Sequence, residues 1–169
     1  MDGCQRLKIV MKQLIVFLIC VLAIISCQKN KCTLAKYSYN FSENRKVDTV
    51  RFGGYILSVQ IIPGNNIVFS YSLVGESCPN RTDGPSSERL VFEIPAGVTN
   101  FEYSDATIQS AQCYYENSSG AGSTNDATRM IRGIIKRDKI SANSWLIEVN
   151  LAIPLRVVPL SFRQQFNLG

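Results

Sequence analysis

Apolar and polar residues alternate with a period of two over most of the chain that follows residue 36. This period is typical of β-strands with one buried face, whereas an amphipathic helix has a period of about 3.6. The clearest runs cover residues 55–61 and 67–73, on either side of a Pro-Gly-Asn-Asn segment at 63–66. Proline presets φ, and glycine and asparagine tolerate positive φ, so this segment is predicted to be a hairpin turn.

A second hairpin is predicted from residues 128–137 and 145–153, with its turn at 141–144. The second of these runs places apolar side chains on one face: Trp145, Ile147, Val149, Leu151 and Ile153. Such a face packs into a core while the alternate side chains point to water. We therefore predict that Trp145 is a core residue and not a platform for a ligand.

Shorter alternating runs occur at residues 90–94, 101–103, 106–116 and 160–166, and turn residues separate them. The pattern predicts about eight or nine short strands and no amphipathic helix after the leader. We expect a single all-β domain over residues 37–169, built as an antiparallel β-sandwich. A closed antiparallel β-barrel is the alternative.

An apolar run of about a dozen residues follows Lys12 and covers residues 14–26. A helix that crosses a bilayer needs about 20 apolar residues, so this run fits the hydrophobic part of a signal peptide better. We predict a signal peptide at residues 1–26, with an uncleaved short membrane anchor as the alternative. Met1 and Met11 both remain candidates for the start.

The apolar run ends in Ile24-Ile25-Ser26-Cys27, which resembles the lipobox of bacterial lipoprotein precursors. The resemblance implies a diacylglyceryl group on the Cys27 thiol, cleavage before Cys27 and an acyl chain, such as palmitate, on the new amino terminus. Two or more chains anchor a protein stably, since each buried methylene contributes about 0.8 kcal/mol. Residues 27–36 are then a lipidated tether. Gln28 stands where aspartate would favour the inner membrane, which implies the outer membrane of a Gram-negative cell.

The chain as a whole is similar in style to small lipoproteins of Bacteroidetes-type bacteria. That resemblance implies a place in the cell envelope and no particular activity. One alternative is a soluble secreted protein with Cys27 in a disulfide. Another is a eukaryotic glycoprotein, because Asn-x-Ser/Thr triplets begin at Asn40, Asn80 and Asn117.

The cysteines of the exported part are predicted to form one disulfide. Lipid on Cys27 leaves Cys32, Cys78 and Cys113 after the leader. An oxidising compartment favours pairing, although three is an odd number. We predict a Cys78–Cys113 disulfide and place Cys32 in the tether, with buried free thiols as the alternative to pairing.

The chain contains no histidine, which excludes catalysis by Ser-His-Asp or Cys-His groups and zinc sites built on imidazole. No G-x-S-x-G or S-x-x-K motif and no phosphate-binding loop before a helix is present. Four acidic residues cluster in sequence: Glu88, Glu93, Glu102 and Asp105. Glu93 points away from its apolar neighbours on a strand, so we interpret these carboxylates as a solvated face. We expect no enzyme activity, no cofactor and no metal.

The formal net charge is +5, and removal of the leader, with three basic residues and one acidic residue, leaves +3. So small an excess does not indicate a nucleic-acid partner. The densest basic cluster consists of Arg129, Arg132, Lys136, Arg137 and Lys139. This cluster suggests contact with an anionic polymer, such as lipopolysaccharide or an acidic glycan. The alternative is a set of solubilising charges that discourage edge-to-edge pairing of strands.

These patterns together predict a membrane-anchored cell-envelope lipoprotein with a non-catalytic β domain that binds or scaffolds an unidentified protein or glycan. One alternative is an inhibitor of an envelope-directed enzyme, with residues 117–126 as the inserting loop. Another is a lipocalin-like carrier, which requires a closed barrel around an apolar cavity.

Overall fold

The computed structural model describes residues 32–78, 84–120, 126–129, 132–154 and 156–169. The chain divides into two compact units, and the larger one contains Leu34–Glu76 and Thr82–Gly169. The smaller unit contains Met1–Thr33 and Ser77–Arg81. The predicted signal peptide and Cys27 lie outside the described residues. No helix in the described ranges is long and apolar enough to cross a membrane.

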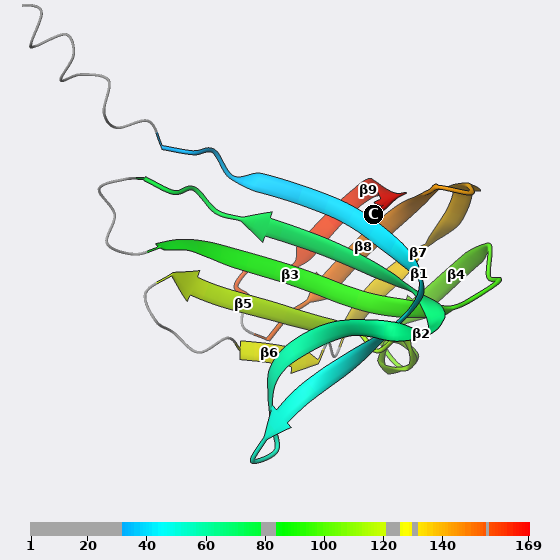
Figure 1. Cartoon of the computed structure of the whole chain (residues 1–169), viewed down its shortest axis with the longest axis horizontal. Coiled ribbons are helices and arrows are strands. Elements are labelled where there is room, and N and C mark those ends of the chain that lie inside the picture. The colour runs from blue at the N-terminus through cyan, green and yellow to red at the C-terminus, as the bar shows by residue number, and fades with distance from the viewer. Residues whose placement is uncertain (1–31, 79–83, 121–125, 130–131, 155) are drawn as a thin grey trace, which may run out of the picture. The chain divides into compact units, whose positions relative to one another are not determined.

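The larger unit consists of one nine-stranded sheet in the order β4-β7-β8-β9-β1-β2-β3-β5-β6. All neighbouring strands are antiparallel except β1 and β9, which are parallel. The sheet curls into a half-barrel (Figure 1). The strands are β1 (Lys36–Phe52), β2 (Tyr55–Val74), β3 (Gly84–Pro95), β4 (Asn100–Ser104), β5 (Tyr114–Gly120), β6 (Asp126–Arg129), β7 (Arg132–Ser141), β8 (Ser144–Ala152) and β9 (Leu160–Leu168). The all-β class and the strand number are confirmed, and a single mixed sheet curled into a half-barrel is consistent with the predicted sandwich or barrel.

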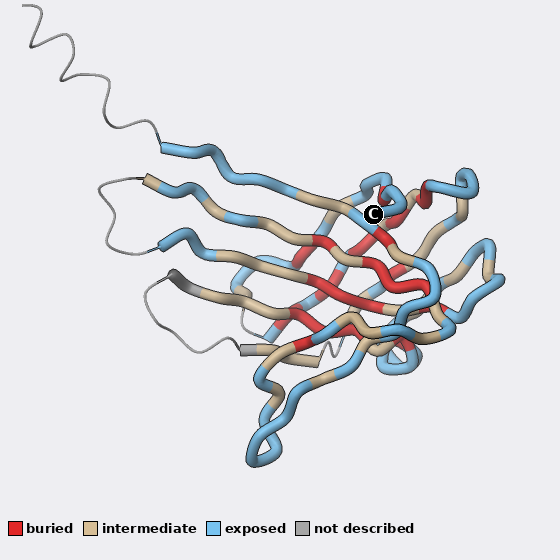
Figure 2. Tube along the Cα trace, in the orientation of Figure 1, coloured by how far each residue is buried: buried red, intermediate tan, exposed pale blue. Residues whose placement is uncertain are grey.

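The main core lies on the concave face of the sheet, where the curl brings β2 and β3 against β8 and β9. Phe69 stacks on Phe92 with ring centroids 5.0 Å apart, and Trp145 meets Phe69 edge to face at 5.4 Å. The apolar face predicted for residues 145–153 is buried along its whole length, and Trp145 itself is fully buried. Figure 2 shows these buried segments crossing the middle of the sheet.

The strand predicted for residues 106–116 begins only at Tyr114. Before it lies a short 3₁₀ helix, η1 (Ile108–Ala111), whose Ile108 and Ala111 side chains are buried in the main core. The Thr107 hydroxyl accepts a hydrogen bond from the Ser104 amide at 2.9 Å and donates one to the Ser104 carbonyl at 3.0 Å. This local turn satisfies the backbone in place of a strand ladder.

The predicted turn at residues 63–66 is wrong, because β2 continues through it. The chain reverses instead at Gly53 and Gly54, with φ of +55° and +89°, and β1 is the partner strand. At residues 63–66 a β-bulge bends both strands, and Arg45 pairs with both Pro63 and Asn66. A Cβ on Gly64 would lie 2.7 Å from the Cβ of Lys46, so glycine permits the close approach at this bend.

The predicted Cys78–Cys113 disulfide is also wrong. Cys78 is bonded to Cys32, with Cα atoms 4.2 Å apart, and Thr33 and Ser77 form a β-bridge beside the bond. Cys113 is a free thiol enclosed in the main core, where it cannot reach a cysteine in an exposed segment. Burial raises the pKa of the Cys113 thiol, so this residue is inert and not a reactive nucleophile.

Candidate binding surface

The most distinctive surface is carried by the part of β1 and β2 that extends beyond the bulge. Residues 45–62 of these strands pair only with one another in the sheet, and we call this two-stranded segment the arm. Figure 1 shows the arm bending away from the half-barrel and ending in the turn between β1 and β2. Two features define its geometry: what holds its base, and what its end exposes.

The base of the arm packs on the convex face of the sheet, opposite the main core. Val59 of the arm is buried together with Val68, Val91 and Tyr114, which come from β2, β3 and β5. Partly buried residues extend this second cluster: Val47, Ile56, Ile61 and Ala127. Apolar contact therefore fixes the inner side of the arm.

An ion pair on the convex face holds the backbone of Val59. Glu116 accepts a hydrogen bond from the Val59 amide at 2.7 Å, and Arg89 donates one to the Val59 carbonyl at 3.1 Å. Arg89 and Glu116 also contact each other at 3.1 Å, and both side chains are partly buried. Together the two side chains occupy both hydrogen-bonding groups of Val59, as a neighbouring strand would.

Glu93 holds the arm at a second point. Its Oε2 accepts a hydrogen bond from the Val47 amide at 2.6 Å, and its Oε1 accepts one from the Asn66 side chain at 3.1 Å. Glu93 does point away from the core, as predicted. Its interpretation as part of a solvated face is wrong, because the half-buried carboxylate is occupied by the arm.

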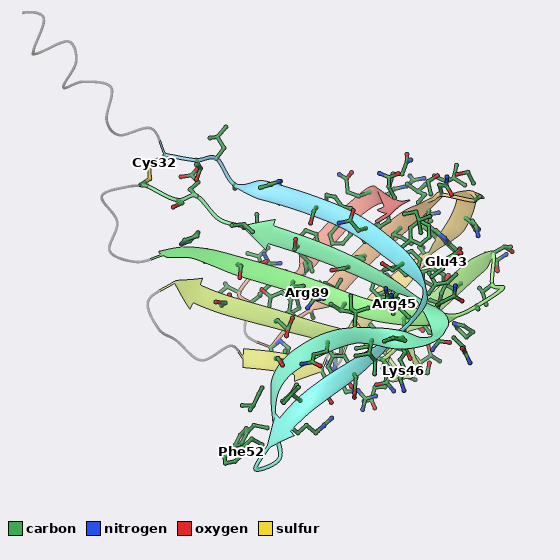
Figure 3. The ribbon with its side chains drawn as sticks, in the orientation of Figure 1. Cys32, Glu43, Arg45, Lys46, Phe52 and Arg89 are labelled. Carbon is green, nitrogen blue, oxygen red and sulfur yellow. A yellow bond between two sulfur atoms is a disulfide. The ribbon has the colours of Figure 1, made fainter. Side chains whose placement is uncertain are left out.

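The end of the arm exposes a cluster of apolar side chains, which we call the apolar tip. Its members are Val50 (40% exposed), Phe52 (75%), Tyr55 (79%) and Leu57 (47%). Phe52 and Tyr55 are a directly opposed cross-strand pair beside the Gly53-Gly54 turn, so their rings lie on one face. Figure 3 shows Phe52 at the extremity of the arm.

The charged residues of the arm are three basic ones, Arg45, Lys46 and Arg51, and one acidic one, Asp48. No Asp or Glu occurs between Asp48 and Glu76, and β2 contains no charged residue at all. Arg45, Lys46 and Arg51 are exposed on β1, and within the described residues none of them forms an ion pair. The arm is therefore apolar at its end and mildly basic along one strand.

Four residues of the predicted basic cluster make internal contacts, and Arg132 is exposed without an ion pair among the described residues. Lys136 and Arg137 both pair with Glu148, and the hydrogen bond from Arg137 lowers the pKa of that carboxyl. Lys139 lies 3.6 Å from Glu43, and Arg129 donates to the Gln109 carbonyl at 2.9 Å. Four of the five side chains thus serve the structure of the domain itself, and contact of the cluster with an anionic polymer stays a prediction.

Of the other residues in the predicted acidic cluster, Glu102 is exposed on β4, and Glu88 and Asp105 make structural contacts. Glu88 pairs with Arg156 at 3.4 Å, and Asp105 accepts a hydrogen bond from the Gly133 amide at 2.6 Å. In the ranges that the structure describes, no three side chains of His, Cys, Asp or Glu come together as a metal site would require.

No family model, no curated protein and no solved structure matches this chain. The function must therefore be argued from the residues alone.

The sequence analysis missed the arm, although the sequence carries signals for it. Gly53 and Gly54 between Phe52 and Tyr55 form a two-residue hairpin turn of a well-known kind. Val91 and Tyr114 fall on the face opposite the main core, which indicates that something covers the convex face. The holding residues carry no local signal, since Glu93 and Glu116 bind backbone groups 46 and 57 residues away.

Proposed function

We propose that this protein is a membrane-anchored lipoprotein of the cell envelope whose non-catalytic β domain binds its partner through the apolar tip. The observation that carries the binding role is the exposure of Phe52 and Tyr55 at the end of an arm held by Glu93, Arg89 and Glu116. Exposed apolar clusters on soluble domains mark interaction sites. A surface that is already held in place loses less entropy when it binds.

The lipobox-like segment at residues 24–27 supports the anchoring role. The Cys32–Cys78 disulfide is in keeping with export, since disulfides persist in oxidising compartments. Cys32 and Cys78 are bonded to each other and Cys113 is buried, so none of the described cysteines needs Cys27 as a disulfide partner. Lipidation of Cys27 is therefore compatible with the pairing that the fold contains.

The anchoring role is tested by the intact mass of the protein recovered from native membranes. We expect a species that begins at Cys27, carries acyl chains, and in denaturant without reduction has one alkylatable thiol, that of Cys113. The variant Cys27→Ser should lose both the added mass and the membrane fraction. Cys20→Ser makes the same change within the leader and should keep both. A wild-type protein that is unmodified, or that begins at another residue, overturns the anchoring role.

A second candidate function is inhibition of an envelope-directed enzyme. The arm favours this inhibitory function, because a hairpin that is fixed at its base and ends in aromatic residues is a better inserting element than residues 117–126. Residues 121–125 of that predicted loop lie outside the described residues. Cell-wall hydrolases assayed with the wild type and with a Phe52→Ser/Tyr55→Ser double variant test this. Inhibition that the double variant lacks would support it, and equal inhibition by both would exclude the arm.

The structure lends no support to a lipocalin-like carrier. The concave face, where such a protein holds its ligand, is filled by buried rings and aliphatic chains such as Phe69, Phe92, Trp145 and Phe166. A core packed in this way has no room for a ligand of similar size without rearrangement.

A further inference from the structure

We propose that the partner of the apolar tip is the surface of a lipid bilayer with anionic headgroups. This inference rests on the proposed role of the apolar tip as the binding surface, and it names the chemistry of the partner. It does not depend on lipid at Cys27, because the apolar tip is a separate element of the fold.

The side chains of the apolar tip match the interfacial zone of a bilayer. Aromatic rings are enriched at the boundary between headgroups and acyl chains, and Phe52 and Tyr55 are the most exposed rings of the arm. The backbone of the arm is also suited to this zone, because its two strands hydrogen-bond each other up to the Phe52–Tyr55 pair. The arm has no further strand partner, so the outward-facing backbone groups of its two strands and those of the Gly53-Gly54 turn must stay at the level of the hydrated headgroups.

The charges favour an anionic surface. The arm carries three basic residues, Arg45, Lys46 and Arg51, and one acidic residue, Asp48, so its net charge is positive. Arg51 adjoins Phe52, and Arg45 and Lys46 lie at the base of the arm (Figure 3). Long basic side chains can bury their methylene stems and still direct their charges to phosphate.

A protein groove is a poorer match than a lipid surface. Protein interfaces orient their partners through hydrogen bonds placed among the apolar contacts. Residues 50–57 offer only two polar side chains, Arg51 and Tyr55. The apolar tip is a projecting end and not a hollow, so a fluid bilayer can receive it without a matching shape.

The test places a fluorescent indole at the apolar tip of the full chain by Phe52→Trp and reconstitutes the variant into vesicles. The vesicles contain phosphatidylcholine and phosphatidylglycerol with brominated acyl chains, which quench indoles in contact with them. Trp145 is fully buried and supplies a constant background. The matched control is Val157→Trp, at a fully exposed aliphatic residue outside the arm. Far-UV circular dichroism confirms that each variant is folded.

We expect bromine quenching at least severalfold stronger for Phe52→Trp than for Val157→Trp, with a blue shift of the emission. Quenching should weaken when phosphatidylglycerol is replaced by phosphatidylcholine or when salt is raised. Equal quenching of the two variants overturns the proposal. A blue shift without quenching also overturns it and points to a second copy of the chain. Quenching that does not depend on phosphatidylglycerol overturns the anionic component. None of these results changes the acyl mass at Cys27, so failure of this inference and failure of the anchoring role are distinguishable.

Discussion

The β7–β8 and β1–β2 hairpins share the same alternation of apolar and polar residues, but their apolar faces have different surroundings. In β7–β8 the apolar face is buried throughout β8, from Trp145 to Leu151. In β1–β2 the alternation continues past the bulge, where the main core ends, and it finishes in Phe52 and Tyr55, which are about three-quarters exposed. An apolar run in a strand pattern thus predicts a strand, but the tertiary position of that strand decides whether the apolar face is a core or a contact surface.

Replacement of a core residue should have the largest effect on stability. Trp145→Ala removes a fully buried side chain that packs against Phe69 and Phe101, and we expect it to lower the free energy of unfolding by about 3–5 kcal/mol. Trp145→Phe should cost less, since it keeps a ring and removes an indole N–H that has no acceptor among the described atoms. Urea denaturation measures both. Equal losses for the two variants would show that ring packing is not the main contribution.

Loss of the disulfide should have the next largest effect. Cys32 precedes β1 and Cys78 follows β2, so the bond closes a loop that contains the whole β1–β2 hairpin, with a sequence separation of 46. Loop closure of this length stabilises by about 4 kcal/mol in the chain-entropy model. Cys32→Ser should lower the denaturation midpoint. Dithiothreitol should lower the midpoint of the wild type and leave the midpoint of the variant unchanged. A wild-type midpoint that does not respond to dithiothreitol would contradict the pairing.

Removal of a residue that holds the arm should have a moderate effect confined to the arm. Glu116→Ala leaves the Val59 amide without its acceptor and removes one acceptor of Arg89, which keeps the Val59 carbonyl, at a cost of about 1 kcal/mol. Hydrogen exchange at the Val59 amide should accelerate, while exchange in β8 should not change. Glu102→Ala, an exposed carboxylate on β4, is the control. Unchanged exchange at Val59 would mean that apolar packing alone holds the arm.

Truncation at the apolar tip should have the smallest effect on stability. Phe52→Ala removes a ring that is 75% exposed, so we expect the free energy of unfolding to change by no more than about 0.5 kcal/mol. Thermal or urea denaturation of Phe52→Ala and of Trp145→Ala measures the two losses for comparison. A loss approaching that of the core variant would show that the apolar tip is a structural element and not a binding surface.

The sequence predicted the parts of the fold that depend on local pattern. The β7–β8 hairpin, the buried face of β8 and the strands around Leu90 and Leu160 follow from alternation. The turn of the β1–β2 hairpin was predicted at the wrong place because the segment contains two turn sequences, at residues 53–54 and 63–66. At residues 63–66 the strand forms a bulge opposite Arg45 and the chain does not reverse. The cysteine pairing was wrong because three cysteines allow three pairings, and spacing cannot reveal that Cys113 is enclosed.

The strand order also has a consequence for the rate at which the chain folds. β4 pairs with β7, although β3 and β5, its neighbours in sequence, pair with each other. The two halves of the sheet meet where β1 and β9 pair at only two positions, Asn40 with Asn167 and Phe41 with Leu168. Contacts so distant in sequence must form against a large loss of chain entropy, which slows folding to about milliseconds to seconds in comparable β proteins. We expect the two halves of the sheet, β4-β7-β8-β9 and β1-β2-β3-β5-β6, to form first. The pairing of β1 with β9 should form last and complete the core.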